Sequence, residues 1–147
     1  MADTYTYLPG WKGARLAYWD ADATPAPAYV PVACITSRNE SNVSRVKEKV
    51  NVCTQGKIER TVTAIDRTVS VSGEVTDANS LEELRAIQNS KAYHKFRVYK
   101  SLTTDTPLYF KAIITNLNAD YPAGQGEDAT FTMDLEIDKD GYKTTDV

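Results

Sequence analysis

The sequence predicts a mainly β protein: an antiparallel β-sandwich or open barrel with one short α-helix and one long polar hairpin arm. Residues 129–138 alternate apolar and polar side chains without a break, and residues 65–76 do the same. This period of two is typical of strands with one buried and one wet face. Only one segment, at about 80–89, has helical periodicity. With 147 residues the chain has the size of one domain, so we expect a single unit over 1–147.

The N-terminal part is predicted to hold two further strands. Residues 12–19 can form the first of them. A loop from Asp20 to Pro27 follows, because its prolines cannot donate hydrogen bonds to a sheet. Residues 29–36 resume an extended run, in which Pro31 marks an edge strand or a strand start.

The composition changes over about 38–57, which is polar and charged with only isolated valines. The segment holds five basic residues against two acidic ones, a net charge of +3. The basic residues are Arg38, Arg45, Lys47, Lys49 and Lys57. Because the segment has little apolar surface to bury, we interpret it as a long hairpin arm or a mobile loop. Residues 127–147 are acidic instead, with seven acids against two lysines.

The second half is predicted to begin with the helix and to continue with three strands. Ser80 and Glu83 form a capping box at the start of a helix over 79–89. The apolar side of this helix consists of Leu81, Leu84 and Ile87. The strands are expected at about 92–100, with Phe96 and Val98 inward, at 108–117 and at 129–138. Turns are expected at 103–107 and 121–126.

No catalytic, cofactor-binding or metal-binding constellation is present in the pattern. The only histidine, His94, falls in the middle of a predicted strand without a nucleophile motif beside it. Asp134, Glu136 and Asp138 lie two apart on one strand face, an arrangement typical of solvated surface, and no calcium-binding loop accompanies them. The sequence therefore predicts that the protein is not an enzyme and has no cofactor or metal.

Two cysteines, Cys34 and Cys53, are too few for a disulfide framework. We expect both to be reduced and buried, although a bridge is conceivable if their strands pair. No stretch approaches transmembrane length, and the first twenty residues contain no signal-like apolar run. A protein made in a cytoplasm, away from membranes, is the expectation.

Three passages in this order resemble the major tail tube proteins of long-tailed phages, particularly the compact siphophage class. They are residues 29–37 leading into the polar arm, residues 68–75 before the helix, and residues 112–136 as the closing hairpin. The resemblance covers nearly the whole chain. It implies a structural virion protein that forms homohexameric rings, which stack into the hollow tail tube through which DNA is ejected into the host.

The resemblance also implies partners and surfaces. The partners are further copies of the chain, tail tip or baseplate proteins, tail terminator proteins and, in contractile systems, a sheath; assembly takes place in the host cytoplasm. The basic arm is the candidate for contact between rings. A wall of hydroxyls and acids suits the lumen because like charge repels phosphate, so DNA passes without sequence-specific binding. The candidate lumen residues are Thr130, Thr132, Asp134, Glu136 and Asp138, with Thr68, Ser70, Ser72 and Glu74 on a second strand.

Two alternatives remain. The first is an inner tube subunit of a contractile tail, a phage-tail-like bacteriocin or an injection system, which shares the fold. The second is a monomeric β-sandwich module that binds carbohydrate or another ligand. Such a module predicts exposed aromatic side chains in one cleft.

Overall fold

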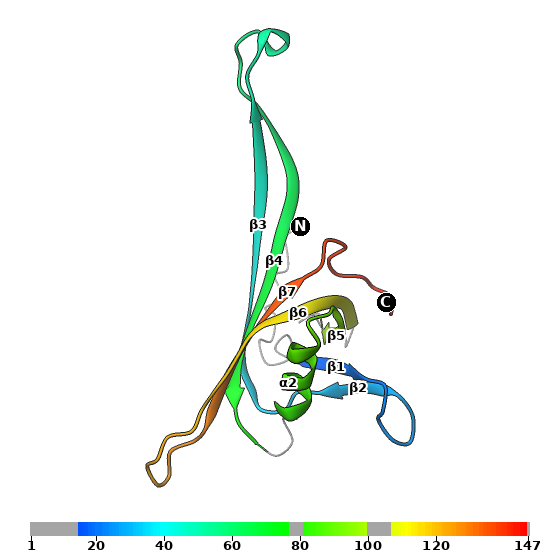
Figure 1. Ribbon diagram of the computed structural model, residues 1–147, viewed down its shortest axis with the longest axis vertical. Coiled ribbons are helices and arrows are strands. Elements are labelled where there is room, and N and C mark those ends of the chain that lie inside the picture. Colours follow the sequence, from blue (N-terminus) through cyan, green and yellow to red (C-terminus); the bar gives the residue numbers. More distant parts are fainter. Residues whose placement is uncertain (1–14, 77–80, 100–106, 147) are drawn as a thin grey trace, which may run out of the picture.

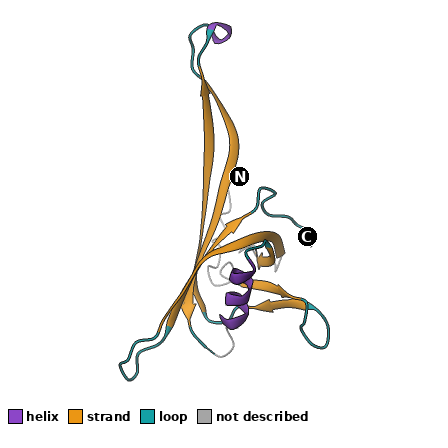
Figure 2. Ribbon diagram, viewed as in Figure 1, coloured by secondary structure: helices purple, strands orange, loops and turns teal. Residues whose placement is uncertain are grey.

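The structure is a computed structural model that describes residues 15–76, 81–99 and 107–146. Its strands are β1 (Leu16–Asp20), β2 (Ala28–Pro31), β3 (Ile35–Lys49), β4 (Glu59–Glu74), β5 (His94–Tyr99), β6 (Pro107–Asp120) and β7 (Thr130–Ile137). They form one antiparallel sheet in the order β2-β1-β5-β6-β7-β4-β3, which is not closed into a barrel (Figure 1). A 3-10 helix, η1 (Val52–Thr54), and an α-helix, α2 (Leu81–Ser90), complete the elements (Figure 2). The mainly β fold with one short α-helix is confirmed.

The sheet bends within β6. One half consists of β2, β1, β5 and the first part of β6, and the other half consists of the second part of β6 with β7, β4 and β3. Residues 107–112 of β6 pair with β5, and residues 112–120 pair with β7. A register shift between Ile114 and Asn116 leaves Thr115 as an extra residue, a β-bulge. The buried positions are even-numbered up to Ile114, whereas Leu117 and Ala119 pack on the core beyond it. The bulge therefore keeps one face of a bent strand on the core.

The core lies between the two halves of the sheet and beneath α2. In Figure 1 the helix, β1, β2 and β5 all lie on one side of the part formed by β3, β4, β7 and β6. The predicted inward residues of the helix and of the last strands are buried, which confirms their assignment: Leu81, Leu84, Ile87, Phe96, Val98, Phe131, Met133, Leu135 and Ile137. The opposite side of these four strands carries no element of the described chain.

The predicted strand over 29–36 is wrong in its extent, because a turn divides it. β2 ends at Pro31, Cys34 adopts the left-handed conformation with φ 57°, and β3 begins at Ile35. Gly73 of β4 lies against this turn. A Cβ atom at Gly73 would be 2.4 Å from the carbonyl oxygen of Cys34, so only glycine fits this approach.

The arm is a long β-hairpin, and its predicted extent of 38–57 is too short. That range covers most of β3 and the tip, but β4 starts at Glu59 and pairs along the whole length of β3, from Lys49 opposite Glu59 down to Ile35 opposite Gly73. The predicted strand start at residue 65 is therefore six residues late. Both strands of the arm are exposed, so no burial pattern marks them, and backbone pairing holds them together.

The arm tip is capped by its own side chains. Asn51 Oδ1 accepts a hydrogen bond from Thr54 N (3.1 Å), and Thr54 Oγ1 accepts one from Asn51 N (2.9 Å). Cys53 is exposed at this tip and Cys34 is exposed at the opposite end of β3, so the expectation of buried thiols is wrong. Both cysteines are free.

Two further expectations are refined by the described residues. His94 is the first residue of β5 rather than a mid-strand residue, and its Nε2 lies 2.6 Å from the carbonyl oxygen of Trp19. Ser80 of the predicted capping box, residues 12–14 of the first predicted strand and most of the 103–107 turn lie outside the described residues.

Candidate assembly surfaces

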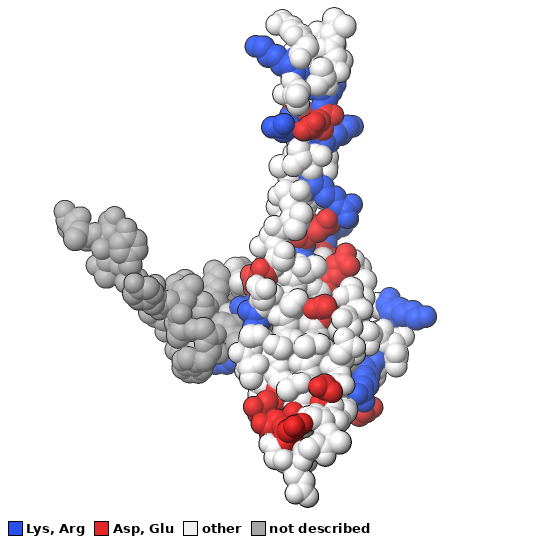
Figure 3. Space-filling model, turned by 90° about the vertical axis from the view of Figure 1, so that its left-hand side faces the viewer, with Lys and Arg blue, Asp and Glu red and all other residues white. Residues whose placement is uncertain are grey.

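One face of the four strands β3, β4, β7 and β6 carries hydroxyl and acidic side chains, and no described helix or strand covers it. We call it the wet face and define it by the paired residues of β4 and β7. The register places Thr68 opposite Glu136, Ser70 opposite Asp134, Ser72 opposite Thr132 and Glu74 opposite Thr130. In the view of Figure 3, acidic groups lie over the body, and most of the basic ones lie on the arm or at the margin.

Hydrogen bonds join the wet face across its strands. Asp134 Oδ1 accepts a hydrogen bond from Ser70 Oγ (2.8 Å), and Asp134 Oδ2 accepts one from Asn116 Nδ2 (3.3 Å). Asn118 Nδ2 donates to Asn116 Oδ1 (2.9 Å). Asp134 therefore connects β4 to β6 and is half-buried between them. The contribution of β6 was missed in the sequence, although Asn116 and Asn118 alternate with Leu117 and Ala119 there.

Eight of the nine candidate lumen residues lie together on the wet face, four on β4 and four on β7, and Asp138 is set apart. Thr130, Thr132 and Glu136 are exposed beside Asp134. Asp138 follows the end of β7 and is half-buried in a recess with Lys111, Asp140, Gly141 and Lys143.

Two basic residues of β5 are held in aromatic contacts at the other end of the sheet. Lys95 Nζ lies 4.2 Å from the ring centroid of Trp19 and 3.7 Å from Asp146 Oδ1. The guanidinium carbon of Arg97 lies 5.0 Å from the ring centroid of Tyr29. Cation–π contacts of this kind stabilise the Lys95 and Arg97 side chains against the aromatic rings. The pKa of Tyr29 is raised well above its ordinary value by burial and by its hydrogen bond to Asp146.

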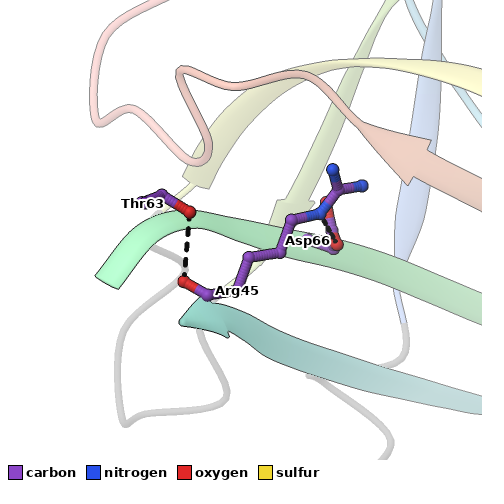
Figure 4. Close-up of polar contacts among 3 residues, drawn as sticks. All are labelled: Arg45, Thr63 and Asp66. Carbon is purple, nitrogen blue, oxygen red and sulfur yellow. Dashed lines mark hydrogen bonds and ion pairs between the residues drawn. The ribbon is translucent and has the colours of Figure 1, made fainter. Parts of the chain in front are cut away.

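A bulge divides the arm and decides which side chains share a face. Arg45 pairs with Ala64 and Val46 with Val62, so Thr63 is the extra residue on β4. Thr63 Oγ1 donates to the carbonyl oxygen of Arg45 (3.3 Å; Figure 4). β3 is regular from Ser37 to Lys49, so alternation along β3 assigns the faces.

Three of the five basic residues predicted for the arm share one face. Arg45, Lys47 and Lys49 alternate on the continuation of the wet face, and we call them the basic arm face. Arg45 Nε donates to Asp66 Oδ2 (2.7 Å), and this hydrogen bond and charge raise the pKa of Arg45 further (Figure 4). Arg38 lies on the core side at the arm root, where it forms an ion pair with Glu40. Lys57 follows η1 at the tip.

The opposite face of the arm continues the core side of the sheet and carries an apolar cluster beside the Arg60–Glu48 ion pair. Val46 lies opposite Val62, and Ile65 lies opposite Ser44, which shares a face of β3 with Val46. We call Val46, Val62 and Ile65 the apolar arm face; these residues are 51%, 58% and 40% exposed. In the sequence these residues appear as isolated, and only the register brings them together.

The C-terminal segment supports the arm root. Tyr142 packs edge-on against Phe110, with 5.3 Å between ring centroids, and forms a hydrogen bond with Glu40. Burial, followed by the charge of Glu40, raises the pKa of Tyr142 well above its ordinary value. Gly141, with φ 65°, lies directly against Arg67 of β4. These contacts attach the last residues to both strands of the arm.

Two strand edges of this half of the sheet have no partner among the described strands. β3 is the last strand in the order and pairs only with β4 among the described strands. Residues 113–120 of β6 pair with β7 on one side and with no described strand on the other. Free edges are templates for pairing with another chain.

Among the described residues, no group of three His, Cys, Asp or Glu side chains is placed to hold a metal ion. The described part of the chain also contains no helix with the length and apolar character that crossing a membrane requires.

No protein family model and no curated protein matches the sequence. Several solved structures match the fold. A chain of the tail of an empty GTA particle, refined with helical C6 symmetry, has a TM-score of 0.64 at 15% identity over 90% of this chain and 96% of its own. A chain of the anti-feeding prophage baseplate has a TM-score of 0.57 at 12% identity, over 97% and 96%. The SPP1 tail tube protein has a TM-score of 0.54 at 13% identity, over 85% and 74%. The chain therefore has the fold of phage tail tube proteins.

Proposed function

We propose that this chain is a structural, non-catalytic subunit that forms rings, which stack into the hollow tail tube of a virion. The observation that carries the proposal is the four-stranded half of the sheet, with one uncovered wet face and two free edges. The fold shared with the GTA tail and the SPP1 tail tube supports it.

Ring closure follows from the number and direction of these strands. β3, β4, β7 and β6 alternate in direction, so β6 runs opposite to β3. A rotation that brings the free edge of β3 beside residues 113–120 of a neighbour's β6 therefore makes an antiparallel pair. Repeating one such head-to-tail contact closes a ring and pairs both the β3 edge and the edge of residues 113–120. A ring of six is the expectation, and the C6 symmetry of the GTA tail supports it.

The wet face is the surface that would line such a ring. Thr130, Thr132, Asp134 and Glu136 would face the lumen, and Asp138 would stand at its rim. The core side, with α2, β1, β2 and β5, would then form the outer wall. Acidic and hydroxyl groups repel phosphate and offer no counterion release, so DNA would slide past without binding. On this basis we propose a conduit for DNA ejection.

The arm would connect successive rings, because a contact that does not close extends an assembly into a filament. The partners at the ends of the tube would be tail tip or baseplate proteins and tail terminator proteins. A subunit of this kind would be assembled in the host cytoplasm and reside in the virion tail.

The inner tube of a contractile tail or injection system is a second candidate, with a sheath as an additional partner. It is favoured by the match to the anti-feeding prophage baseplate, whose chain is covered to 96%. A sheath protein that co-purifies with the tubes would select it over the non-contractile tail.

The proposal is tested with the purified full-length chain and an arm-shortened variant. Val43 lies opposite Asp66, so replacing residues 44–65 by Asn-Gly closes the hairpin with a two-residue turn. We expect concentrated wild-type protein to form hollow tubes in negative-stain micrographs, and we expect the variant to stay folded without forming tubes, as monomers or single rings in sedimentation velocity. A wild-type chain that stays monomeric at every concentration, with or without tail tip proteins, would instead favour a monomeric ligand-binding module.

A further inference from the structure

The arm exposes an unusual amount of aliphatic surface. Seven exposed large aliphatic residues belong to it: Val43, Val46, Val50, Val52, Ile58, Val62 and Ile65. Of these, Val46, Val62 and Ile65 form the apolar arm face, whereas Val43 lies on the other face of β3. A two-stranded hairpin is marginal in water unless it packs on something. In Figure 1 the arm extends beyond the rest of the sheet, and the described residues offer its apolar face no cover.

We propose that the apolar arm face, and not the basic arm face, is the surface with which the arm docks on the body of a second copy of this chain. This inference rests on the proposed tube and deepens it. It assigns the contact between rings to Val46, Val62 and Ile65. Lys47 and Lys49 then contribute little binding free energy to that contact.

A second copy is the occupant that the charges favour. Residues 38–67 hold seven basic and four acidic side chains, a net charge of +3. The whole chain has a net charge of −3, so the remaining residues carry −6. An arm of one copy and the body of another are therefore complementary, which guides association and register. In a stacked assembly every arm also has a copy within reach.

The ion pairs already present make the basic face a weak source of binding free energy. Arg45 is paired with Asp66 in the isolated chain, and Arg60 Nε donates to Glu48 Oε1 (2.9 Å) on the apolar face. Lys47 and Lys49 form no ion pair with another described residue, and both are exposed. Exposed charge pairs contribute little to binding, whereas burying an aliphatic side chain contributes considerably more. The charges steer the arm, and the apolar face holds it.

Two double variants on neighbouring rungs separate these contributions. Val46→Thr with Val62→Thr makes the apolar face polar while it keeps the shape and β-branching that favour a strand. Lys47→Thr with Lys49→Thr is the matched control on the opposite face of β3. Circular dichroism and thermal unfolding of the monomers check that the fold is retained. The critical concentration for tube formation is then measured by sedimentation at low and high salt.

We expect the valine variant to raise the critical concentration by ~10-fold or more, and the lysine variant to change it by less than ~3-fold. High salt should leave the wild-type value nearly unchanged, because an apolar contact is not screened. Wild-type tubes together with an unaffected valine variant or a failing lysine variant would overturn this inference and leave the tube intact. Wild-type protein that never forms tubes would overturn the proposed function itself.

Discussion

Adding a single methyl group at Gly73 should displace the strand edge on which ring closure depends. The Cβ of Gly73→Ala would lie 2.4 Å from Cys34 O, 2.9 Å from Phe131 Cε1 and 3.0 Å from Ile35 Cα. Two of these atoms belong to the backbone of the turn and the start of β3, which cannot move aside as a flexible side chain can. Overpacking of this kind costs about 1–3 kcal/mol. With backbone atoms on one side and a buried ring on the other, we expect about 2–3 kcal/mol.

Urea unfolding followed by circular dichroism measures this loss as a lower midpoint with an unchanged slope. Thr68→Ala is the control, because Thr68 is an exposed residue of the same strand and its replacement should change stability by less than about 0.5 kcal/mol. The variant should also assemble at a higher concentration than wild type, since the edge of β3 shifts. A Gly73→Ala protein as stable as the control would refute the close approach of β3 to β4 at this point.

Two further predictions concern the arm root and the wet face. Tyr142→Phe keeps the ring packing but loses the hydrogen bond to Glu40, so it should lower stability by about 0.5–1.5 kcal/mol at neutral pH. Because folding raises the pKa of Tyr142, its contribution is complete below about pH 10 and declines as the pH rises further; wild type should therefore lose stability above that pH more steeply than the variant in urea titrations. Glu136→Lys with Thr132→Lys should leave the monomer folded and give it salt-sensitive affinity for duplex DNA in fluorescence anisotropy, where wild type shows none. Equal affinity of both proteins would contradict the view that this face excludes DNA.

Much of the fold can be predicted from the sequence because burial imposes a period on it. β7 alternates without a break, since one of its faces packs on the core and the other meets water. α2 was located by three apolar residues at helical spacing. Where a strand has no buried face, as in the first half of β4, the period disappears, so the sequence predicts a strand start at residue 65 instead of Glu59.

Features that depend on strand register or on a local turn cannot be predicted from the sequence. The left-handed Cys34 interrupts an apparently continuous strand, and cysteine carries no signal for that conformation. The bulge at Thr63 determines that Val46 and Val62 face each other, and no spacing rule reveals an extra residue in one strand. Eight wet-face residues can be predicted in two groups of four because each group alternates along one strand, whereas Asn116 and Asn118 require the pairing of β6 with β7.

A cryo-EM reconstruction of tubes assembled from the purified chain tests the central claim most directly. We expect a continuous inner sheet, in which β3 of each subunit pairs antiparallel with residues 113–120 of β6 in its neighbour. The side chains of Thr130, Thr132, Asp134 and Glu136 should point into the bore, with α2 outside. Tubes whose bore is lined by β1, β2 and β5, or rings joined through other strands, would contradict this account.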